Sequence, residues 1–236
     1  MIKLKEILTE GVYDPGIFKA VFTAGGPGSG KSYTASTLFG MPEKMPYVSA
    51  KGLKGVNSDS AFEAYLDKAG LSHDIKSLDA EQYEKAMTLR NQAKRVTAKR
   101  MHGYINGKLG MLVDGTGKNY DKIANMKKQL QNHGYDCYMV FVNTTLEVAL
   151  ERNAKRPRKV PEEIVKKGWH AVQDNLGRFQ TLFGAGNMLI VDNSSFKEFP
   201  SVVKKAASKF VNKPIKNPVA KKWIKKELEL RKKSWI

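Results

Sequence analysis

Short apolar runs alternate with longer segments of helical composition along most of the chain. The apolar runs predict buried strands at 18–24, 109–113, 136–142 and 188–191, with a short extended piece before Asn57. The remaining segments predict helices at 31–38, 61–69, 80–105, 120–132, 146–152, 162–183 and 199–210. This alternation is typical of an α/β domain, a doubly wound parallel sheet of about five strands with helices on both faces.

Both ends of the chain lie outside this alternation. Residues 1–13 predict a short helix that ends at the turn Asp14-Pro15-Gly16. Near the other end, Pro214 and Pro218 interrupt the chain before a lysine-rich helix at 219–235. We therefore expect an N-terminal extension (1–17), an α/β domain (18–212) and a basic C-terminal tail or helix (213–236).

Positive charge is concentrated in this tail. The whole chain has a formal charge of +18, and residues 197–236 hold 13 Lys/Arg against 3 Asp/Glu. A basic segment attracts polyanions, so the tail is a candidate for binding nucleic acid. The alternative is that Trp223, Leu228 and Trp235 pack the helix onto the domain while its lysines face water.

Composition also excludes several classes of protein. No apolar run approaches the roughly 20 residues of a membrane-spanning helix, and no secretory signal is apparent, so we expect a cytoplasmic protein without a membrane partner. A single cysteine, Cys137, excludes an internal disulfide framework, and its apolar surroundings predict a buried thiol. The four histidines lack the spacing of metal ligands.

A glycine-rich segment between the first strand and the first long helix predicts a triphosphate site. Residues 25–32, GGPGSGKS, match G-x-x-x-x-G-K-[ST] in the strand-to-helix context that this motif requires. Glycines let successive main-chain N–H groups point at phosphate oxygens, and the helix N-terminus adds its dipole. Lys31 is expected to reach the β- and γ-phosphates and Ser32 to bind Mg²⁺. The alternative is a tight glycine turn.

Further along the chain are the other groups that phosphoryl transfer needs, namely carboxylates and cations. Asp59 follows the extended piece and is a candidate general base, or else the N-cap of the next helix. Asp114 ends a strand and is a candidate for Mg²⁺, directly or through water, or else a turn residue. Three arginines, Arg152, Arg156 and Arg158, are candidates for binding phosphate oxygens. The alternative is that they form a run of charges exposed to water. We expect the first two on one face of a helix end.

Together these motifs resemble the P-loop kinases of the polynucleotide 5′-kinase and zeta-toxin type over roughly residues 18–191. The matching segments are GGPGSGKS, NSD with Asp59, MLVDGTG with Asp114 and Thr116, and ERNAKRPRKVP. The resemblance implies ATP and Mg²⁺ as cofactors, Asp59 as base and an arginine-bearing lid. The expected nucleotide contacts are Gly25, Gly26, Pro27, Gly28, Ser29, Gly30, Lys31, Ser32, Tyr33, Arg152, Arg156 and Arg158.

The acceptor is left open by one departure from that pattern. In the polynucleotide kinases an arginine commonly follows the base by three residues, whereas this chain has Phe62, which stacks on an acceptor or packs in the core. The hypothesis is a kinase with catalytic Asp59, Lys31, Arg152 and Arg156, acting on a polynucleotide 5′-hydroxyl or a UDP-sugar. The alternative is a non-catalytic ATP-binding protein that attaches to nucleic acid or another partner.

Overall fold

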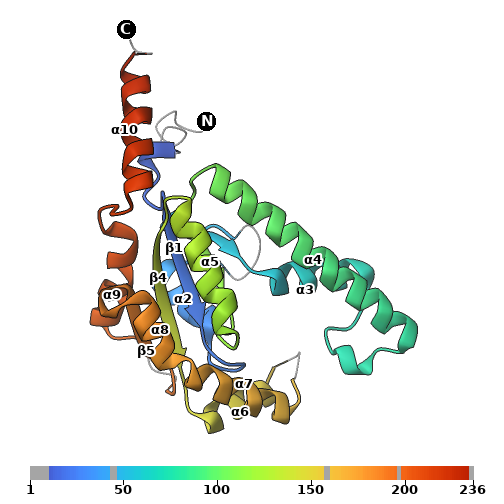
Figure 1. Cartoon of the computed structure of the whole chain (residues 1–236). Helices are drawn as coiled ribbons and strands as arrows, with labels where there is room; N and C mark the ends of the chain where they lie inside the picture. Colours follow the sequence, from blue (N-terminus) through green and yellow to red (C-terminus); the bar gives the residue numbers. More distant parts are fainter. Residues whose placement is uncertain (1–10, 43–46, 157–159, 196–197, 234–236) are drawn as a thin grey trace.

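The computed structural model describes residues 11–42, 47–156, 160–195 and 198–233, and its centre is a five-stranded parallel sheet (Figure 1). The strand order is β2-β3-β1-β4-β5. The strands are β1 Lys19–Ala24, β2 Lys54–Val56, β3 Met111–Asp114, β4 Asp136–Asn143 and β5 Met188–Asp192. The predicted α/β class and parallel sheet are confirmed.

Helices follow the strands close to the predicted positions. They are α2 Lys31–Phe39, α3 Ser58–Ala69, α4 Ala80–Asn106, α5 Tyr120–Asn132, α6 Leu146–Ala154, α7 Glu162–Asp174, α8 Leu176–Phe183, α9 Ser201–Asn212 and α10 Pro218–Lys233. Short 3-10 turns occur at Gly11–Tyr13, Ile75–Ser77 and Ala185–Asn187. The helix predicted within residues 1–13 falls mostly outside the described residues.

One predicted helix, at 162–183, is in fact two. α7 and α8 meet at Asn175, a buried residue whose side-chain amide donates to the main-chain oxygens of Gly117 (3.0 Å) and Lys118 (3.1 Å). Helical periodicity continues through this position, so the sequence pattern does not mark the break. The break lets Asn175 hold the segment that follows β3.

Two hydrophobic cores cover the two faces of the sheet. Along β1, Ala20 and Phe22 face the core that includes α5 and α8, whereas Val21 faces the core beneath α2 and α9. Successive side chains of a strand point to opposite faces, which is why one short apolar strand supplies both cores. A third cluster, which includes Phe62 and Ala93, joins α3 to α4 in an arm at the side of the sheet (Figure 1).

The carboxyl end of β1 is the point from which the chain goes to both sides of the sheet. β2 and β3 lie on one side of β1, and β4 and β5 lie on the other. Crevices outside the carboxyl ends of strands at such a position are the usual ligand sites of open α/β sheets. The loop 25–30, Asp114 and the start of α6 all lie at this end of the sheet.

α10 packs at the opposite, amino end of the sheet. Ala220 is fully buried, and the Trp223 ring meets the Phe18 ring edge-on with centroids 5.5 Å apart. The main-chain amides of Lys216 and Asn217 donate to the Asp136 carboxylate, at 2.8 and 3.1 Å. α10 is therefore anchored where β1 and β4 begin (Figure 1). No helix in the described part of the chain combines the length and apolarity needed to cross a membrane.

Candidate nucleotide and acceptor site

The loop 25–30 is enclosed by two helices that come later in the chain. A Cβ at Gly28, which has φ +80°, would lie 2.3 Å from the main-chain oxygen of Ala149 in α6. A Cβ at Gly26 would lie 3.4 Å from Cα of Trp169 in α7. Glycine at Gly28 is therefore required by both its backbone conformation and this close approach. The loop leads directly into α2, and the Gly25 main-chain N–H donates to the Thr116 main-chain oxygen (3.1 Å), just after β3.

Lys31, the first residue of α2, has its ammonium group bound by the loop itself. Nζ donates to the main-chain oxygens of Gly25 (2.9 Å) and Gly26 (3.3 Å). Burial lowers the pKa of Lys31, Asp114 raises it, and Arg156 lowers and Asp59 raises it by smaller amounts. Asp114 also lines the same cavity as Lys31, which places the two charges at one site.

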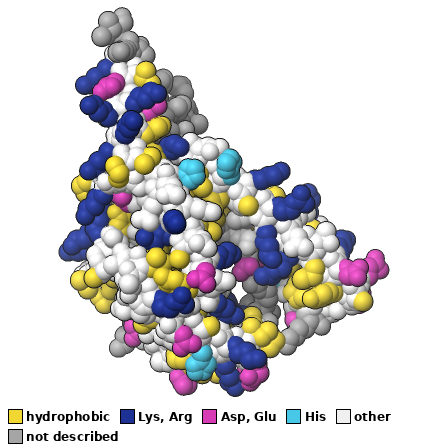
Figure 2. Space-filling model, in the orientation of Figure 1, with side chains coloured by type: hydrophobic (Ala, Val, Ile, Leu, Met, Phe, Trp, Pro, Cys, Tyr) yellow, Lys and Arg dark blue, Asp and Glu magenta, His cyan; other side chains and the backbone are white. Residues whose placement is uncertain are grey.

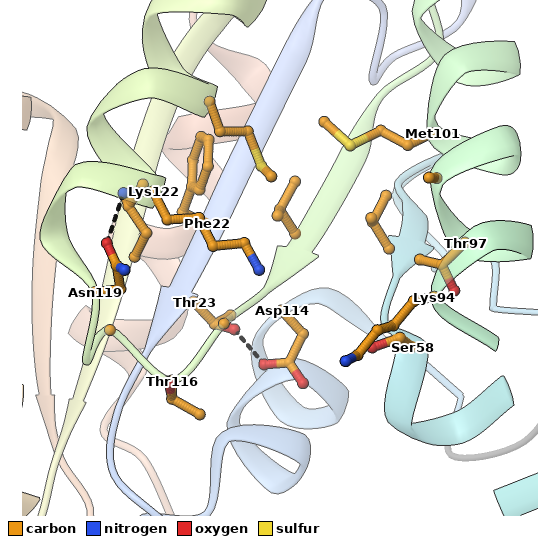
Figure 3. Close-up of a pocket in the computed structure, with 17 residues that line it drawn as sticks. Phe22, Thr23, Ser58, Lys94, Thr97, Met101, Asp114, Thr116, Asn119 and Lys122 are labelled. Atoms are coloured by element: carbon orange, nitrogen blue, oxygen red, sulfur yellow. Dashed lines mark hydrogen bonds between the residues drawn. The ribbon is translucent and has the colours of Figure 1, made fainter. Parts of the chain in front are cut away.

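The Asp114 carboxylate is held in place at the carboxyl end of β3. One oxygen accepts from the Thr23 hydroxyl (2.7 Å), in the neighbouring strand, and the other from the Asn57 amide (2.9 Å). Figure 3 shows the first of these bonds, with Asp114 among the residues that line a cavity between α4 and α5. Asp114 is therefore more than a turn residue, because it joins three segments at the site.

Asp59 lies in the first turn of α3, but it is not the cap of that helix. The cap is Asn57, whose side-chain oxygen accepts from the Asp59 main-chain N–H at 2.7 Å. The N-cap interpretation of Asp59 is wrong. Its carboxylate is 3.8 Å from the Arg90 guanidinium of α4, in a pair that is partly exposed to water. Exposed pairs of this kind contribute little to stability.

The arginines approach the loop from the end of α6. The Arg152 guanidinium is 3.6 Å from the position of a Cβ at Gly30, whereas Arg156 is near enough to Lys31 to shift its pKa. The prediction that one helix carries both arginines is wrong, since α6 ends at Ala154 and Lys155 caps it. Arg158 lies outside the described residues.

Two asparagines at the site escaped sequence analysis. Asn193, after β5, donates its side-chain amide to the Ser29 main-chain oxygen at 2.8 Å and is buried beside the loop. Asn153 bonds both main-chain groups of Val160, at 2.7 and 3.0 Å, and so ties the two sides of the arginine segment together. The role of a single asparagine near the end of a helix or strand cannot be predicted from sequence, because its hydrogen-bond partners can lie far away in the chain.

Two cavities meet at Asp114. The α4–α5 cavity, about 390 Å³, has an apolar floor that includes Phe22 and Met101 and a polar rim that includes Lys94 and Lys122. The α2–α3 cavity, about 690 Å³, is lined by residues that include Lys31, Ser32, Asn57, Glu63 and Asp114. Ser58 lines the first cavity and Ser60 the second, which places the turn that carries Asp59 between them.

Of the other residues predicted to contact the nucleotide or the acceptor, some lie at the site and others pack elsewhere. Ser32 is exposed and lines the same cavity as Asp114, so both can reach one ligand there. The half-exposed Tyr33 ring packs on Phe199, with centroids 5.5 Å apart, at the start of α9. Phe62 is buried in the α3–α4 cluster, so the core-packing alternative is correct. The described residues contain no group of three or more His, Cys, Asp or Glu side chains that could hold a metal.

Comparison with protein families gives a match to the model described as zeta toxin, over residues 12–201. The chain belongs to the zeta toxin family. This match extends from the 3-10 turn before β1 into α9 and includes every predicted site residue. The resemblance noted in the sequence is thereby confirmed at the level of the family. No match was found among curated protein sequences.

Solved structures show the same fold. A chain of the PezAT chromosomal toxin–antitoxin system of Streptococcus pneumoniae has a TM-score of 0.53 and 16% identity, over 88% of this chain and 91% of that one. A chain of the AvrRxo1-ORF1:-ORF2 structure with ATP also has a TM-score of 0.53 and 16% identity, over 80% of this chain and 58% of that one. The zeta toxin family member described here therefore has a P-loop kinase fold.

Proposed function

We propose that this chain is an ATP- and Mg²⁺-dependent kinase that transfers the γ-phosphoryl group to a hydroxyl of a small anionic acceptor. One observation carries the proposal: Lys31, Ser32 and Asp114 line one cavity beside a glycine-rich loop whose carbonyl oxygens bind the Lys31 ammonium group. A phosphate-binding lysine, a cation over the moving phosphoryl group and carboxylates on the acceptor side are what in-line phosphoryl transfer requires.

The nucleotide half of the site fits a triphosphate. Lys31 is bound by loop carbonyl oxygens that phosphate oxygens would replace. The buried Ser29 hydroxyl has no hydrogen-bond partner among the described residues, as suits a group that awaits a ligand. Ser32 and Asp114 would hold Mg²⁺, which takes few protein ligands when it binds to phosphates and water. Bound there, Mg²⁺ would neutralise charge on the phosphates.

Asp59 is the better placed of the two carboxylates to act as general base. Asp114 has both oxygens engaged by Thr23 and Asn57, so it is positioned rather than available for proton transfer. Asp59 lies between Ser58 and Ser60, which line the two cavities on either side of it. It would accept the proton of the attacking hydroxyl, while Arg152 and Arg156 would stabilise the transferred group.

The α4–α5 cavity is the proposed acceptor site. Its volume is within the range of small-molecule pockets, and Lys94 and Lys122 direct their ammonium groups toward its interior from opposite helices (Figure 3). The buried Thr97 hydroxyl on its wall has no hydrogen-bond partner among the described residues. An acceptor with an anionic group and polar substituents fits this lining. A UDP-sugar therefore suits the cavity better than a polynucleotide 5′-hydroxyl.

The acceptor class is tested by incubating the protein with γ-labelled ATP, Mg²⁺ and one candidate acceptor at a time. The candidates are UDP-sugars, nucleosides, and DNA or RNA oligonucleotides with 5′-hydroxyl ends. We expect label in a UDP-sugar, and less label when Lys94 and Lys122 are changed to Gln. Exclusive labelling of oligonucleotides would overturn the small-acceptor assignment. ATP binding without transfer to any acceptor would favour the non-catalytic alternative.

A further inference from the structure

A second group of cations lies on α9, α10 and their connection, remote from the kinase site. We call it the basic ridge, and its members are Lys205, Lys209, Lys213, Lys216, Lys221, Lys222, Lys225 and Lys226. Lys213 is partly covered and the other members are exposed. Figure 2 shows dark-blue side chains along this edge of the molecule, up to the projecting end of α10. The acidic residues of α9 and α10 are Glu227 and Glu229.

The charges of the ridge act on one another. The pKa of Lys213 is lowered first by burial and then by the positive charges of Lys216 and Lys209. On α10, Lys221 and Lys225 are four residues apart, as are Lys222 and Lys226, so they form two adjacent rows on one helix face. Repulsion within such an array is relieved when an anionic ligand binds.

The ridge is held rigidly by the opposite face of α10. Ala220 is buried, and Trp223 and Ile224 pack against the core that includes Phe18. Farther along, the Arg231 guanidinium lies over the Tyr13 ring, 5.5 Å from its centroid. The same helix therefore both packs on the domain and presents lysines, so the two predicted roles of the tail do not exclude each other.

We propose that the basic ridge binds the phosphate backbone of a nucleic acid, at a surface separate from the kinase site. α10 is anchored where β1 begins, and the phosphate loop starts where β1 ends, about 20 Å away for a strand of this length. Because the ridge lies outside the kinase site, binding there would localise the protein whether or not the nucleic acid is also the acceptor. This inference does not depend on the identity of the acceptor.

The shape and chemistry of the ridge favour nucleic acid over a membrane. An interfacial helix needs a continuous apolar face, but the half-exposed apolar side chains of α10, Val219 and Leu230, lie near its opposite ends. Trp223 packs edge-on with Phe18 against the core and is only partly exposed, so the lysines are the main contact surface for a ligand. Lysines along successive helices match a polymer of repeated phosphates, so binding should be independent of base sequence.

The test is fluorescence anisotropy of a labelled 20-base-pair DNA duplex, titrated with the full chain from 50 to 200 mM salt. In the ridge variant Lys221, Lys222, Lys225 and Lys226 are all changed to Gln. The matched control carries four lysine-to-Gln changes at exposed positions elsewhere, namely Lys68, Lys85, Lys128 and Lys167. A second ridge variant, with Lys205 and Lys209 changed to Gln, serves if the first fails to fold.

We expect the ridge variant to bind at least about tenfold more weakly at low salt. Its slope of log affinity against log salt should be smaller by about 0.9 for each phosphate that the variant no longer neutralises. The control should resemble the parent, and phosphotransfer to a small acceptor should be unchanged in both. Equally weakened binding in variant and control would overturn the proposal, because only total charge would then matter. Binding to anionic vesicles but not to the duplex would also overturn it.

Discussion

Lys19 begins β1 and Lys31 begins the helix that follows β1 and the phosphate loop, and the two lysines have different kinds of surroundings. Lys19 begins β1, is 2% exposed, and bonds to Asp136 (3.3 Å), Tyr138 (3.4 Å) and the Lys213 main-chain oxygen (2.7 Å). Lys31 begins α2 and bonds to loop carbonyl oxygens. Burial lowers the pKa of both. The first lysine joins structural elements, whereas the second is held where a ligand can replace its partners.

The largest expected effect concerns the carboxylate across from Lys31. Asp59→Asn should leave ATP affinity within about twofold and lower the transfer rate by about 10²–10⁴, because it removes the proposed general base. ATP affinity is measured by calorimetry and transfer under single-turnover conditions.

Glu63→Gln is the matched control, because Glu63 lies one turn further along α3 and lines the α2–α3 cavity. An Asp59→Asn rate close to the parental rate would exclude Asp59 as base.

The second prediction contrasts the two lysines directly. Lys31→Ala should lower ATP affinity and the transfer rate together, the rate by about 10²–10³, and leave the unfolding transition nearly unchanged. Lys19→Ala should reduce the free energy of unfolding by about 3 kcal/mol, since it leaves Asp136 without its buried partner. Both variants are measured by urea unfolding and ATP titration. Equal effects of the two changes on ATP affinity would contradict the distinction between a structural Lys19 and a nucleotide-binding Lys31.

The comparison of the two lysines also shows which features of the molecule can be predicted from sequence. The phosphate loop was predictable because a glycine-rich motif is local, and the strands because apolar runs are local. Asp114 and Lys31 lie at one site because β3 and β1 are neighbours in the sheet, so the sequence supplied the candidates and the fold brought them together.

Other features depend on single long-range contacts and could not be predicted. Asn193 reaches the loop across 164 positions of sequence, and Asn175, where one helix ends and the next begins, bonds to residues 57 and 58 positions away. The position of α10 was likewise undecidable, since Trp223 suits both base stacking and packing. In the structure the Trp223 ring meets the Phe18 ring edge-on, so Trp223 packs α10 onto the domain.

A smaller effect is expected at the amino end. Trp223→Ala should reduce the free energy of unfolding by about 2–4 kcal/mol, because it removes the ring that packs on Phe18. The rate of transfer per folded molecule should be unchanged. Trp223→Phe is the control and should recover most of the stability. A loss of activity without a loss of stability would show that the two ends of the sheet are coupled.

The smallest effect is a pH dependence at Cys137. Burial raises the pKa of this thiol to about 12, so the folded state holds the proton more tightly than the unfolded state does. Its contribution to stability is complete below the unfolded pKa and declines as the pH rises from about 9 toward 12. Between pH 8 and pH 10 the free energy of unfolding should fall less in a Cys137→Ala variant than in the parent. We expect the two losses to differ by about 1 kcal/mol. Parallel urea titrations of parent and variant measure this difference, and identical slopes would contradict it.

The most direct test of the kinase assignment is the stoichiometry of transfer by the unmodified chain. With γ-labelled ATP, Mg²⁺ and a UDP-sugar, ADP and labelled acceptor are quantified over one time course. The account predicts that ADP formation depends on the acceptor and that one labelled acceptor appears for each ADP. ADP formation at the same rate with and without the acceptor, with all of the label in inorganic phosphate, would contradict the kinase assignment.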